Sequence, residues 1–532
     1  MDKLQTLKKY FGHSGFREGQ EPIVDSLLNG HDAVGIMPTG AGKSVCYQLP
    51  AVMMDGVSIV ISPLISLMKD QVNSLNQTGI PAAYLNSSLT DRQFRIALSR
   101  AYNGAYKIIY VAPERLETAG FMKLAESIHI SMITIDEAHC ISQWGQDFRP
   151  GYLKIRDFID CLSYRPVIGA FTATATSNVR NDIINILKLD KPKVVTTGFD
   201  RQNLYFGVEH PKDKMTALAR LLKKYKDRSG IVYCSTRKSV EEVCSKLRHM
   251  GYEATRYHAG LEDEEKILNQ EDFLYDRKTV MVATNAFGMG IDKSNVSFVI
   301  HYNMPKDLES YYQEAGRAGR DGEEAECILL YSKKDVRTAQ WLIDNGTPNE
   351  LLSDEQRENI HLRDKERLKQ MTFYSTTGRC LRQYILNYFG DRRSCTCGKC
   401  SSCCPEKQIE PRNAAPKNIN TDIYVKNSGI ENDYGMSEWK ARQAAKKPAP
   451  QTPFTAKDEE LFAKLKQLRT QKAKVAGVPA FVIFSDAALR DMCRKRPVTK
   501  AEFLEVSGVG QTKAERYGKA FIEEIKNFQG DK

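Results

Sequence analysis

Residues 37–44 read MPTGAGKS and lie between an apolar run, AVGIM, and a helical run, VCYQLPAVM. A strand, a glycine-rich turn and a helix in this order are typical of a phosphate-binding loop, in which backbone amides at the helix N-terminus cradle phosphate. Met37 stands where the strict pattern has its first glycine, but the later glycines still permit the tight turn. Lys43 would neutralise the β and γ phosphates, and Ser44 would bind Mg²⁺. The alternative is a glycine-rich turn with an exposed lysine. The candidate nucleotide-binding residues of this loop are Thr39, Gly40, Gly42, Lys43 and Ser44.

A pair of acidic residues could supply the second half of an ATPase. Asp136 ends the apolar run SMITID at 131–136, and Glu137 follows it. Asp136 can hold Mg²⁺ through water, and Glu137 can orient and deprotonate the attacking water. Alone, such a pair is more often part of a solvated loop. Because it lies about 94 residues after Lys43, we treat the two motifs as one hypothesis.

A third candidate is the segment QEAGRAGRD at 313–321, which carries two arginines among glycines. We expect a helix here, since Gln313, Arg317 and Arg320 would share one face at spacings i, i+4 and i+7. An arginine that reaches across a cleft to the γ-phosphate would stabilise charge in the transition state of hydrolysis. The alternative is a basic helix on the surface.

Short apolar runs alternate with longer amphipathic stretches in two parts of the chain. The runs lie at 33–37, 57–62, 107–112, 131–136 and 167–176, and then at 229–236, 253–259, 279–287, 296–304 and 325–331. Such alternation predicts parallel α/β sheets. We therefore expect two α/β domains, at 1–200 and 201–339. Their shared site should lie in the cleft between them, at the carboxyl ends of the strands.

The remainder of the chain is predicted to be helical apart from one linker. Residues 340–404 predict a small helical platform that ends in a cysteine cluster. Residues 405–452 are polar and interrupted by proline, and they lack apolar periodicity, so we expect a linker. Helical periodicity returns over 453–532. Residues 451–532 contain 16 Lys and Arg against 11 Asp and Glu, so this region is basic.

Charge and composition restrict the classes of function. The chain has 532 residues and a net charge of +11, which suits either a polyanionic partner or a solvated basic surface. It has no run of about 18 apolar residues and no apolar N-terminal stretch typical of a signal peptide. We therefore expect no membrane association and a cytoplasmic, nucleoid-associated location. Six of the 13 cysteines lie between 380 and 404, and in a reducing compartment this cluster indicates a metal rather than disulfides.

Taken together, these motifs resemble those of superfamily-two helicases, and the resemblance is sharpest to the RecQ family of ATP-dependent DNA helicases. It covers residues 1 to about 404 almost continuously, as well as the C-terminal region. The resemblance implies two tandem RecA-like parallel-sheet domains, a helical zinc-binding subdomain at 340–404 and a small all-α HRDC domain at 453–532. The matching segments are FREGQ (16–20), SPLISLMKDQV (62–72), APERL (112–116), DEAHCISQWGQDFRPGY (136–152), TATAT (172–176), YCSTR (233–237), HAGL (258–261), ATNAFGMGIDK (283–293) and SYYQEAGRAGRDG (310–322).

The resemblance also implies how the adenine base is bound. Gln20 would read the edge of adenine, and Arg17 would pack on its ring. His13 stands where the family usually has a tyrosine, so we expect the stacking to persist but to be weaker.

Several further residues would connect the nucleotide with DNA. Trp144, Phe148 and Arg149 resemble the aromatic-rich loop that couples DNA binding to ATP hydrolysis, and Gln146 replaces the usual histidine of that loop. The alternative is that the two aromatic residues only anchor the loop. By the same resemblance, Asp292, Thr174 and Thr176 would link the nucleotide state to movement of the strand.

Four thiolates can close a tetrahedral structural zinc site that leaves no open position for water. The one-plus-three spacing of the family selects Cys380, Cys397, Cys400 and Cys403 as the zinc ligands. Cys395 and Cys404 are close enough in the chain to compete for one of these places. For the C-terminal region, the alternative to a DNA-binding HRDC domain is a basic helical domain that binds protein.

The function implied by the resemblance is a 3′ to 5′ DNA helicase of repair, recombination and replication that uses ATP, Mg²⁺ and Zn²⁺. We expect single-stranded and forked duplex DNA as partners, other repair proteins as further partners, and a monomer. The alternatives are an RNA helicase and a non-catalytic DNA-binding scaffold. Many RecQ proteins also place a winged-helix domain of about a hundred residues before the HRDC domain. Only about fifty residues are available here, so we expect a short form that lacks it.

Overall fold

The computed structural model describes residues 2–143, 145, 147–226, 228–287, 293–346, 353–391, 396–404 and 454–530. The predicted linker at 405–452 lies outside the described residues, as do Trp144, Gln146, Asp292 and Cys395. Among the helices that are described, none combines the length and the apolarity needed to cross a membrane.

The first domain is built on a parallel sheet of seven strands in the order β3-β4-β2-β5-β6-β1-β7. The central strands are buried along nearly their whole length because helices cover both faces, which explains their continuous apolar sequence. The strands are β1 (Ala33–Ile36), β2 (Val57–Ile61), β3 (Ala82–Leu85), β4 (Ile108–Val111), β5 (Ile130–Ile135), β6 (Val167–Thr172) and β7 (Lys193–Thr196).

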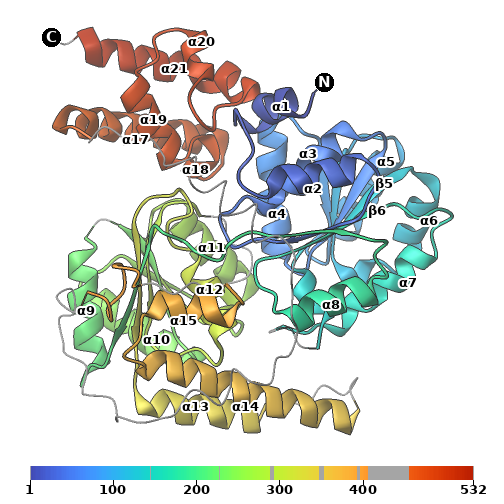
Figure 1. The fold of residues 1–532 in the computed structure, drawn as a ribbon. Helices are drawn as coiled ribbons and strands as arrows, with labels where there is room; N and C mark the ends of the chain where they lie inside the picture. Colours follow the sequence, from blue (N-terminus) through green and yellow to red (C-terminus); the bar gives the residue numbers. More distant parts are fainter. Residues whose placement is uncertain are drawn as a thin grey trace.

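Helices of this domain follow the strands, as expected for an α/β fold (Figure 1). At the N-terminus, α1 (Lys3–Thr6) continues into a π-helical turn, Leu7–Phe11. The helices that follow are α2 (Gln20–Leu28), α3 (Lys43–Met53), α4 (Ile65–Thr78), α5 (Asp91–Tyr102), α6 (Ala119–Ser127), α7 (Lys154–Asp160) and α8 (Ser177–Ile186).

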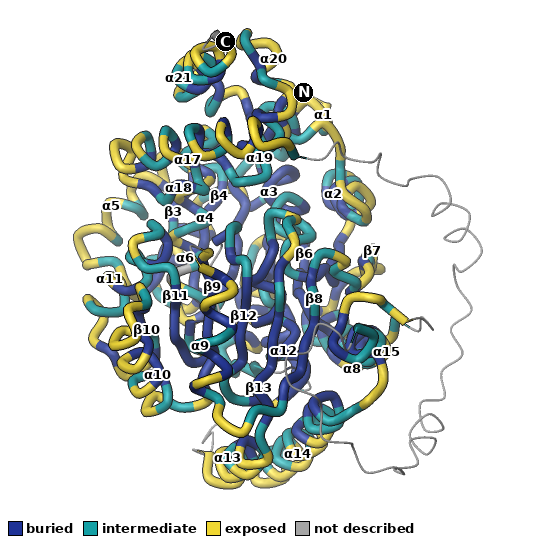
Figure 2. Tube along the Cα trace, turned by 90° about the vertical axis from the view of Figure 1, so that its left-hand side faces the viewer, coloured by how far each residue is buried: buried dark blue, intermediate teal, exposed yellow. Residues whose placement is uncertain are grey.

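The second domain repeats this architecture with six parallel strands in the order β10-β11-β9-β12-β13-β8. The two domains confirm the predicted tandem of RecA-like folds. Figure 2 shows buried residues along the strands of the second sheet, while outward-facing residues of its helices are exposed. The elements are β8 (Leu204–Glu209), β9 (Ser229–Tyr233), β10 (Ala254–Tyr257), β11 (Val280–Ala283), β12 (Val296–His301) and β13 (Ala325–Leu330), with α9 (Lys214–Lys224), α10 (Arg237–His249), α11 (Asp263–Leu274) and α12 (Leu308–Ala315).

Three helices and a cysteine loop pack on the second domain. They are α13 (Lys333–Asp344), α14 (Asp354–Thr376) and α15 (Leu381–Tyr388). The loop after α15 adds to the free edge of the sheet, because the Ser401 amide donates to the Phe206 carbonyl at 2.9 Å and Cys400 bridges Phe206 of β8. Helix α13 spans the boundary that we placed between residues 339 and 340.

Residues 454–530, which we call the C-terminal module, form a separate helical unit with its own core around Leu461, Phe484, Leu489 and Phe521. Its helices are α17 (Ala456–Ala476), α18 (Ala480–Ile483), α19 (Asp486–Lys495), α20 (Lys500–Leu504) and α21 (Gln511–Gly530). In Figure 1 the module lies above the second domain and beside α1 of the first domain, and α21 contacts α4.

Contacts join the C-terminal module to both α/β domains. On the first domain, the Gly508 amide donates to the Gly12 carbonyl at 3.0 Å, and the Thr512 hydroxyl donates to the Thr78 carbonyl at 3.1 Å. On the second, Arg490 pairs with Glu323 at 3.2 Å. The module is therefore docked across the two domains.

Candidate active site and metal centre

The predicted phosphate loop lies between β1 and α3. Gly40 and Gly42 both have φ of +86°, a left-handed conformation that side chains disfavour. A Cβ on Gly42 would also lie 2.4 Å from Nε2 of Gln20, so glycine is required there. The Met37 amide donates to the Thr172 carbonyl and extends β1, while its side chain is buried in the core, which explains why this position does not need glycine.

A cavity of about 290 Å³ opens in front of this loop, between the two α/β domains. All six residues that we predicted to be catalytic line it, from the phosphate loop and the end of β5 on one side and the segment after β12 on the other. The predicted residues that line it are Thr39, Gly40, Gly42, Lys43, Ser44, Asp136, Glu137, Gln313, Arg317 and Arg320.

The acidic pair lies at the carboxyl end of β5. Glu137 adopts φ of +48°, a strained conformation for a residue with a side chain. Its carboxylate lies 3.8 Å from Nζ of Lys43. Burial alone would raise the pKa of Glu137, but Lys43 and His139 lower this pKa to about 2. In contrast, burial and the nearby charge of Glu137 raise the pKa of Asp136 to about 6. Glu137 is therefore held ionised, and a cation beside Asp136 would favour its ionised form.

A chain of polar contacts leads from Glu137 across the cleft. Nδ1 of His139 lies 3.3 Å from the Glu137 carboxylate and 2.9 Å from the Thr172 hydroxyl, and that hydroxyl donates to the Thr174 carbonyl at 3.0 Å. Nε2 of Gln313, from the second domain, donates to the Thr174 hydroxyl at 3.1 Å. We did not single out His139 or Thr172 from the sequence; the place of His139 two residues after the acidic pair was the available signal.

The two arginines lie in a turn rather than on a helix, which corrects our expectation. Helix α12 ends at Ala315, and Gly316 and Gly319, the latter with φ of +57°, allow the chain to turn there. Arg317 and Arg320 nevertheless both line the cavity. Arg317 is buried, and its Nε has no hydrogen-bond partner in the described part of the chain. A buried cationic side chain that lines a cavity suits a phosphate group.

The residues predicted to bind adenine lie on the outer side of the phosphate loop. Nε2 of Gln20 donates to the carbonyls of Ala41 and Gly42, and its Oε1 accepts from the Arg17 amide at 2.8 Å. Oε1 keeps a second lone pair that could accept from the amino group of adenine. Arg17 donates to the Gly40 carbonyl at 2.7 Å. Burial, followed by Arg17, lowers the pKa of His13 to about 4, so the ring is neutral at pH 7.

Part of the predicted coupling loop lies within the described residues. Phe148 is half-buried, and Arg149 binds the Asp147 carboxylate at 2.9 Å and the Pro63 carbonyl at 3.1 Å. Asp147 also lines the cavity, so this loop touches the nucleotide side of the cleft. Thr176 precedes α8, next to the Thr172–Thr174 segment.

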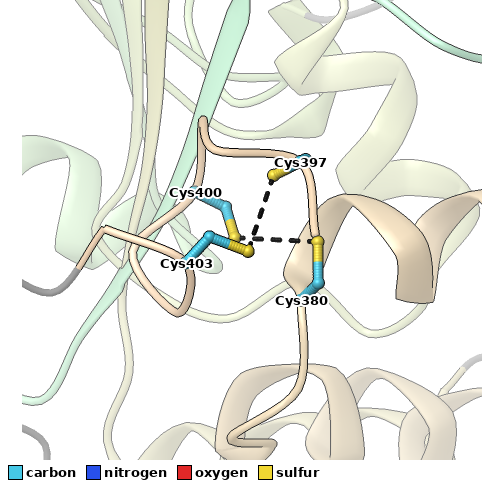
Figure 3. Close-up of side chains that lie close together, drawn as sticks. All are labelled: Cys380, Cys397, Cys400 and Cys403. Atoms are coloured by element: carbon cyan, nitrogen blue, oxygen red, sulfur yellow. Dashed lines mark hydrogen bonds between the residues drawn. The ribbon is translucent and has the colours of Figure 1, made fainter. Parts of the chain in front are cut away.

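Four cysteine sulfurs converge between the start of α15 and the loop that follows it (Figure 3). The Sγ atoms of Cys380, Cys397, Cys400 and Cys403 all lie within 4.8 Å of one another, with separations of 3.9 Å for Cys380–Cys400 and 4.0 Å for Cys397–Cys403. Tetrahedral zinc with Zn–S bonds of about 2.3 Å needs S–S distances of about 3.8 Å, so the four residues fit zinc. Cys404 lies apart from this cluster, because its Sγ contacts the Gly398 carbonyl at 3.0 Å.

Four family models match the chain in order. They are DEAD/DEAH box helicase over residues 17–182, helicase conserved C-terminal domain over 213–322, RecQ zinc-binding over 333–404 and HRDC domain over 458–525. Residues 405–457 lie between the last two matches.

Curated relatives match the chain over nearly its whole length. The ATP-dependent DNA helicase RecQ of Bacillus subtilis is 38% identical over 587 aligned positions, which cover 98% of this chain and 98% of the relative. The protein of the same name from Pasteurella multocida is 36% identical over 603 positions, 99% of this chain and 94% of the relative. Among solved structures, S. cerevisiae Dbp5 bound to RNA and ADP BeF3 has a TM-score of 0.52 at 19% identity, covers 67% of this chain and 94% of that one, and supports the fold alone.

Proposed function

Because the chain belongs to the RecQ family of ATP-dependent DNA helicases, we propose that it hydrolyses ATP with Mg²⁺ on contact with single-stranded DNA and moves 3′ to 5′ along that strand. The observation that carries the proposal is the cavity of about 290 Å³ lined by residues of both α/β domains. A site completed only when two domains meet can convert hydrolysis into relative movement of those domains.

The residues of the first domain bind and activate the reactants. Lys43 and the amides at the start of α3 bind the β and γ phosphates, while Ser44 and Asp136 would hold Mg²⁺, which would supply positive charge to the site. Glu137 orients the attacking water and takes its proton. When Lys43 engages phosphate, it attracts Glu137 less strongly. Glu137 then becomes a stronger base with the nucleotide in place.

The residues of the second domain complete the site when the cleft closes. Arg317 and Arg320 stabilise the charge that develops on the γ-phosphate, and His13, Arg17 and Gln20 bind the adenine base from the first domain. The contact between Gln313 and Thr174 links closure to Glu137 through His139 and Thr172. Opening of the cleft breaks this contact, so the state of the nucleotide and the position of the domains change together.

DNA would be held on the face that the coupling loop borders. Trp144 and Phe148 provide surfaces on which bases stack, Arg149 connects the loop to the nucleotide side, and Asp292 takes part in the coupling. We propose single-stranded and forked duplex DNA as substrates, repair proteins as further partners, a monomeric state and a nucleoid location. Zinc at the four cysteines stabilises the platform and takes no part in hydrolysis.

One experiment tests polarity and substrate together. Partial duplexes of DNA or RNA with a 3′ or a 5′ single-stranded overhang are incubated with ATP and Mg²⁺, and strand separation is followed by gel or fluorescence. We expect unwinding of the DNA duplex with the 3′ overhang. Glu137→Gln, which keeps the shape of the site but removes the base, should bind the same DNA without unwinding it. Unwinding of RNA only, or of the 5′ substrate only, would overturn the proposal.

A further inference from the structure

The segment that joins the two α/β domains carries an arginine that contacts both sides of the nucleotide cleft. Arg201 follows β7 and precedes β8. Its NH1 donates to the Thr39 carbonyl of the phosphate loop at 2.5 Å and to the Gly316 carbonyl at 3.3 Å. Its NH2 donates to the carbonyls of Ala318 and Gly319 at 3.1 and 2.8 Å. One guanidinium therefore ties a loop of the first domain to a turn of the second.

Three of these carbonyls belong to the turn that carries Arg317 and Arg320. Gly316 is the capping residue that follows the last residue of α12. Carbonyls at a helix C-terminus lack partners within the helix and attract a cation. Arg201 donates hydrogen bonds to the Gly316 carbonyl, which precedes Arg317, and to the carbonyls of the two residues that follow Arg317. It thereby fixes the backbone on both sides of Arg317.

Neighbouring residues hold this segment against the second domain. Nδ2 of Asn203 donates to the carbonyls of Gly319 and Glu323 at 2.9 and 2.7 Å. Arg382 of α15, which is buried, donates to the Asp200 carboxylate at 2.6 Å and to the Arg201 carbonyl at 2.7 Å. Arg201 is thus anchored beside the arginine turn, and its contact with Thr39 is the one that reaches across the cleft.

The chemistry of this contact favours a role in hydrolysis over a role in stability alone. The acceptors of Arg201 in the described residues are neutral oxygens, so its positive charge is not cancelled by a carboxylate partner. A Cβ on Gly40 of the phosphate loop would lie 3.1 Å from NH1, so the charge lies directly against that loop. A planar guanidinium can bind several carbonyls at once, which lysine cannot do.

We propose that Arg201 is a positioning residue for ATP hydrolysis, which holds the turn bearing Arg317 and Arg320 in register with the phosphate loop when the cleft closes. This inference rests on the proposed function, since it assigns a role within the same site. Because Arg201 acts through Arg317 and Arg320, its loss should slow the chemical step and leave the binding of ATP and DNA little changed. A displacement of about 1 Å in a catalytic group costs about 10²-fold in rate.

The test compares Arg201→Gln with Arg201→Lys, and with Arg92→Gln on the exposed surface of α5 as a matched control. Steady-state ATP hydrolysis is measured with saturating single-stranded DNA, together with DNA affinity and melting temperature. For Arg201→Gln we expect kcat to fall by about 10- to 100-fold while KM for ATP changes by less than about threefold. Arg201→Lys, which keeps the charge but can reach fewer carbonyls, should fall between Arg201→Gln and the unchanged protein.

A combined variant separates positioning from general damage. If Arg201 acts through Arg317 and Arg320, then adding Arg201→Gln to a variant that already carries both Arg317→Gln and Arg320→Gln should slow hydrolysis by no more than about threefold. The proposal would be overturned if the losses in kcat from the separate substitutions were additive, or if Arg201→Gln left kcat unchanged. It would also be overturned if Arg201→Gln lowered the melting temperature and affected KM and kcat equally. If Arg201→Gln does not fold, Arg201→Lys is used in the same comparison of combined variants. Absence of DNA-stimulated hydrolysis in the unchanged protein would instead defeat the proposed function.

Discussion

Replacing Lys43 with alanine should abolish DNA-stimulated ATP hydrolysis while leaving affinity for single-stranded DNA largely intact. Lys43 lies on the nucleotide side of the cleft, 3.8 Å from the Glu137 carboxylate and in the cavity that both domains line. At that distance, and at an effective dielectric constant of about 20, two unit charges attract by about 4 kcal/mol. A phosphate oxygen that took the place of the carboxylate would gain a similar attraction from Lys43.

The expected loss of rate follows from this energy. About 4 kcal/mol corresponds to roughly three powers of ten in rate, and part of it is already realised in the ground state, so we expect kcat to fall by about 10²- to 10³-fold. Phosphate release in the presence of single-stranded DNA measures hydrolysis, and the anisotropy of a labelled oligonucleotide measures DNA affinity. Lys123→Ala, on the exposed surface of α6, is the matched control and should behave like the unchanged protein.

Two results would refute this reasoning. If Lys43→Ala hydrolysed ATP at more than about a tenth of the normal rate, Lys43 would not be the residue that neutralises the phosphates. If it lost hydrolysis and DNA affinity together with a lowered melting temperature, the effect would be one of folding.

Three other predictions concern pH, zinc and duplex DNA. Burial opposes protonation of His139, but Cys140 and Glu137 raise its pKa from 6.5 to about 10. Protonated His139 therefore stabilises the folded chain fully below pH 6.5, and this stabilisation decreases as the pH rises to about 10. The melting temperature should therefore fall more between about pH 6 and pH 9.5 in the unchanged protein than in His139→Gln, and equal changes would contradict this assignment. Metal analysis should find one zinc per chain. Cys400→Ser should lose the zinc and become poorly soluble, whereas Cys404→Ser should keep it, because the Cys404 thiol lies outside the cluster. Loss of zinc in Cys404→Ser would show that the ligand set is wrong. Removal of residues 454–530 should lower the affinity for blunt and forked duplexes and reduce the dependence of that affinity on salt. Unchanged affinity, or a folded winged helix between 405 and 452, would contradict this prediction.

Much of the fold could be predicted because its strands are continuous apolar runs. Each predicted run overlaps a strand, from β1 through β13, but three strands were missed. Strand β3 is only four residues long, β7 is largely exposed and reads KVVT, and β8 immediately follows the segment that joins the domains. Short or exposed strands depend on pairing with neighbours and leave a weak pattern in the sequence.

The candidate site shows the same division between local and long-range information. The phosphate loop and the acidic pair are local patterns, and the structure places both at the cavity. The arginine turn was predicted as a helix because the spacing of its side chains fits one, whereas its glycines end α12. The contacts of Arg201 with Thr39 and Gly319 join residues more than a hundred positions apart in the chain, and neither propensity nor spacing carries that information.

The docking of the C-terminal module across both domains connects the nucleotide cleft with the outer surface of the protein. Its contacts with the first domain include a backbone hydrogen bond from the Gly508 amide to the Gly12 carbonyl. Its contacts with the second domain include a partly exposed ion pair between Arg490 and Glu323 and a hydrogen bond from the Tyr275 hydroxyl to the Gly477 carbonyl. Exposed ion pairs contribute little to stability, so we expect widening of the cleft to break the contacts with the second domain first. We expect the C-terminal end of α17 and the part of α19 around Arg490 to become accessible once per turnover, so that another macromolecule could recognise the stage of the nucleotide cycle from the outer surface.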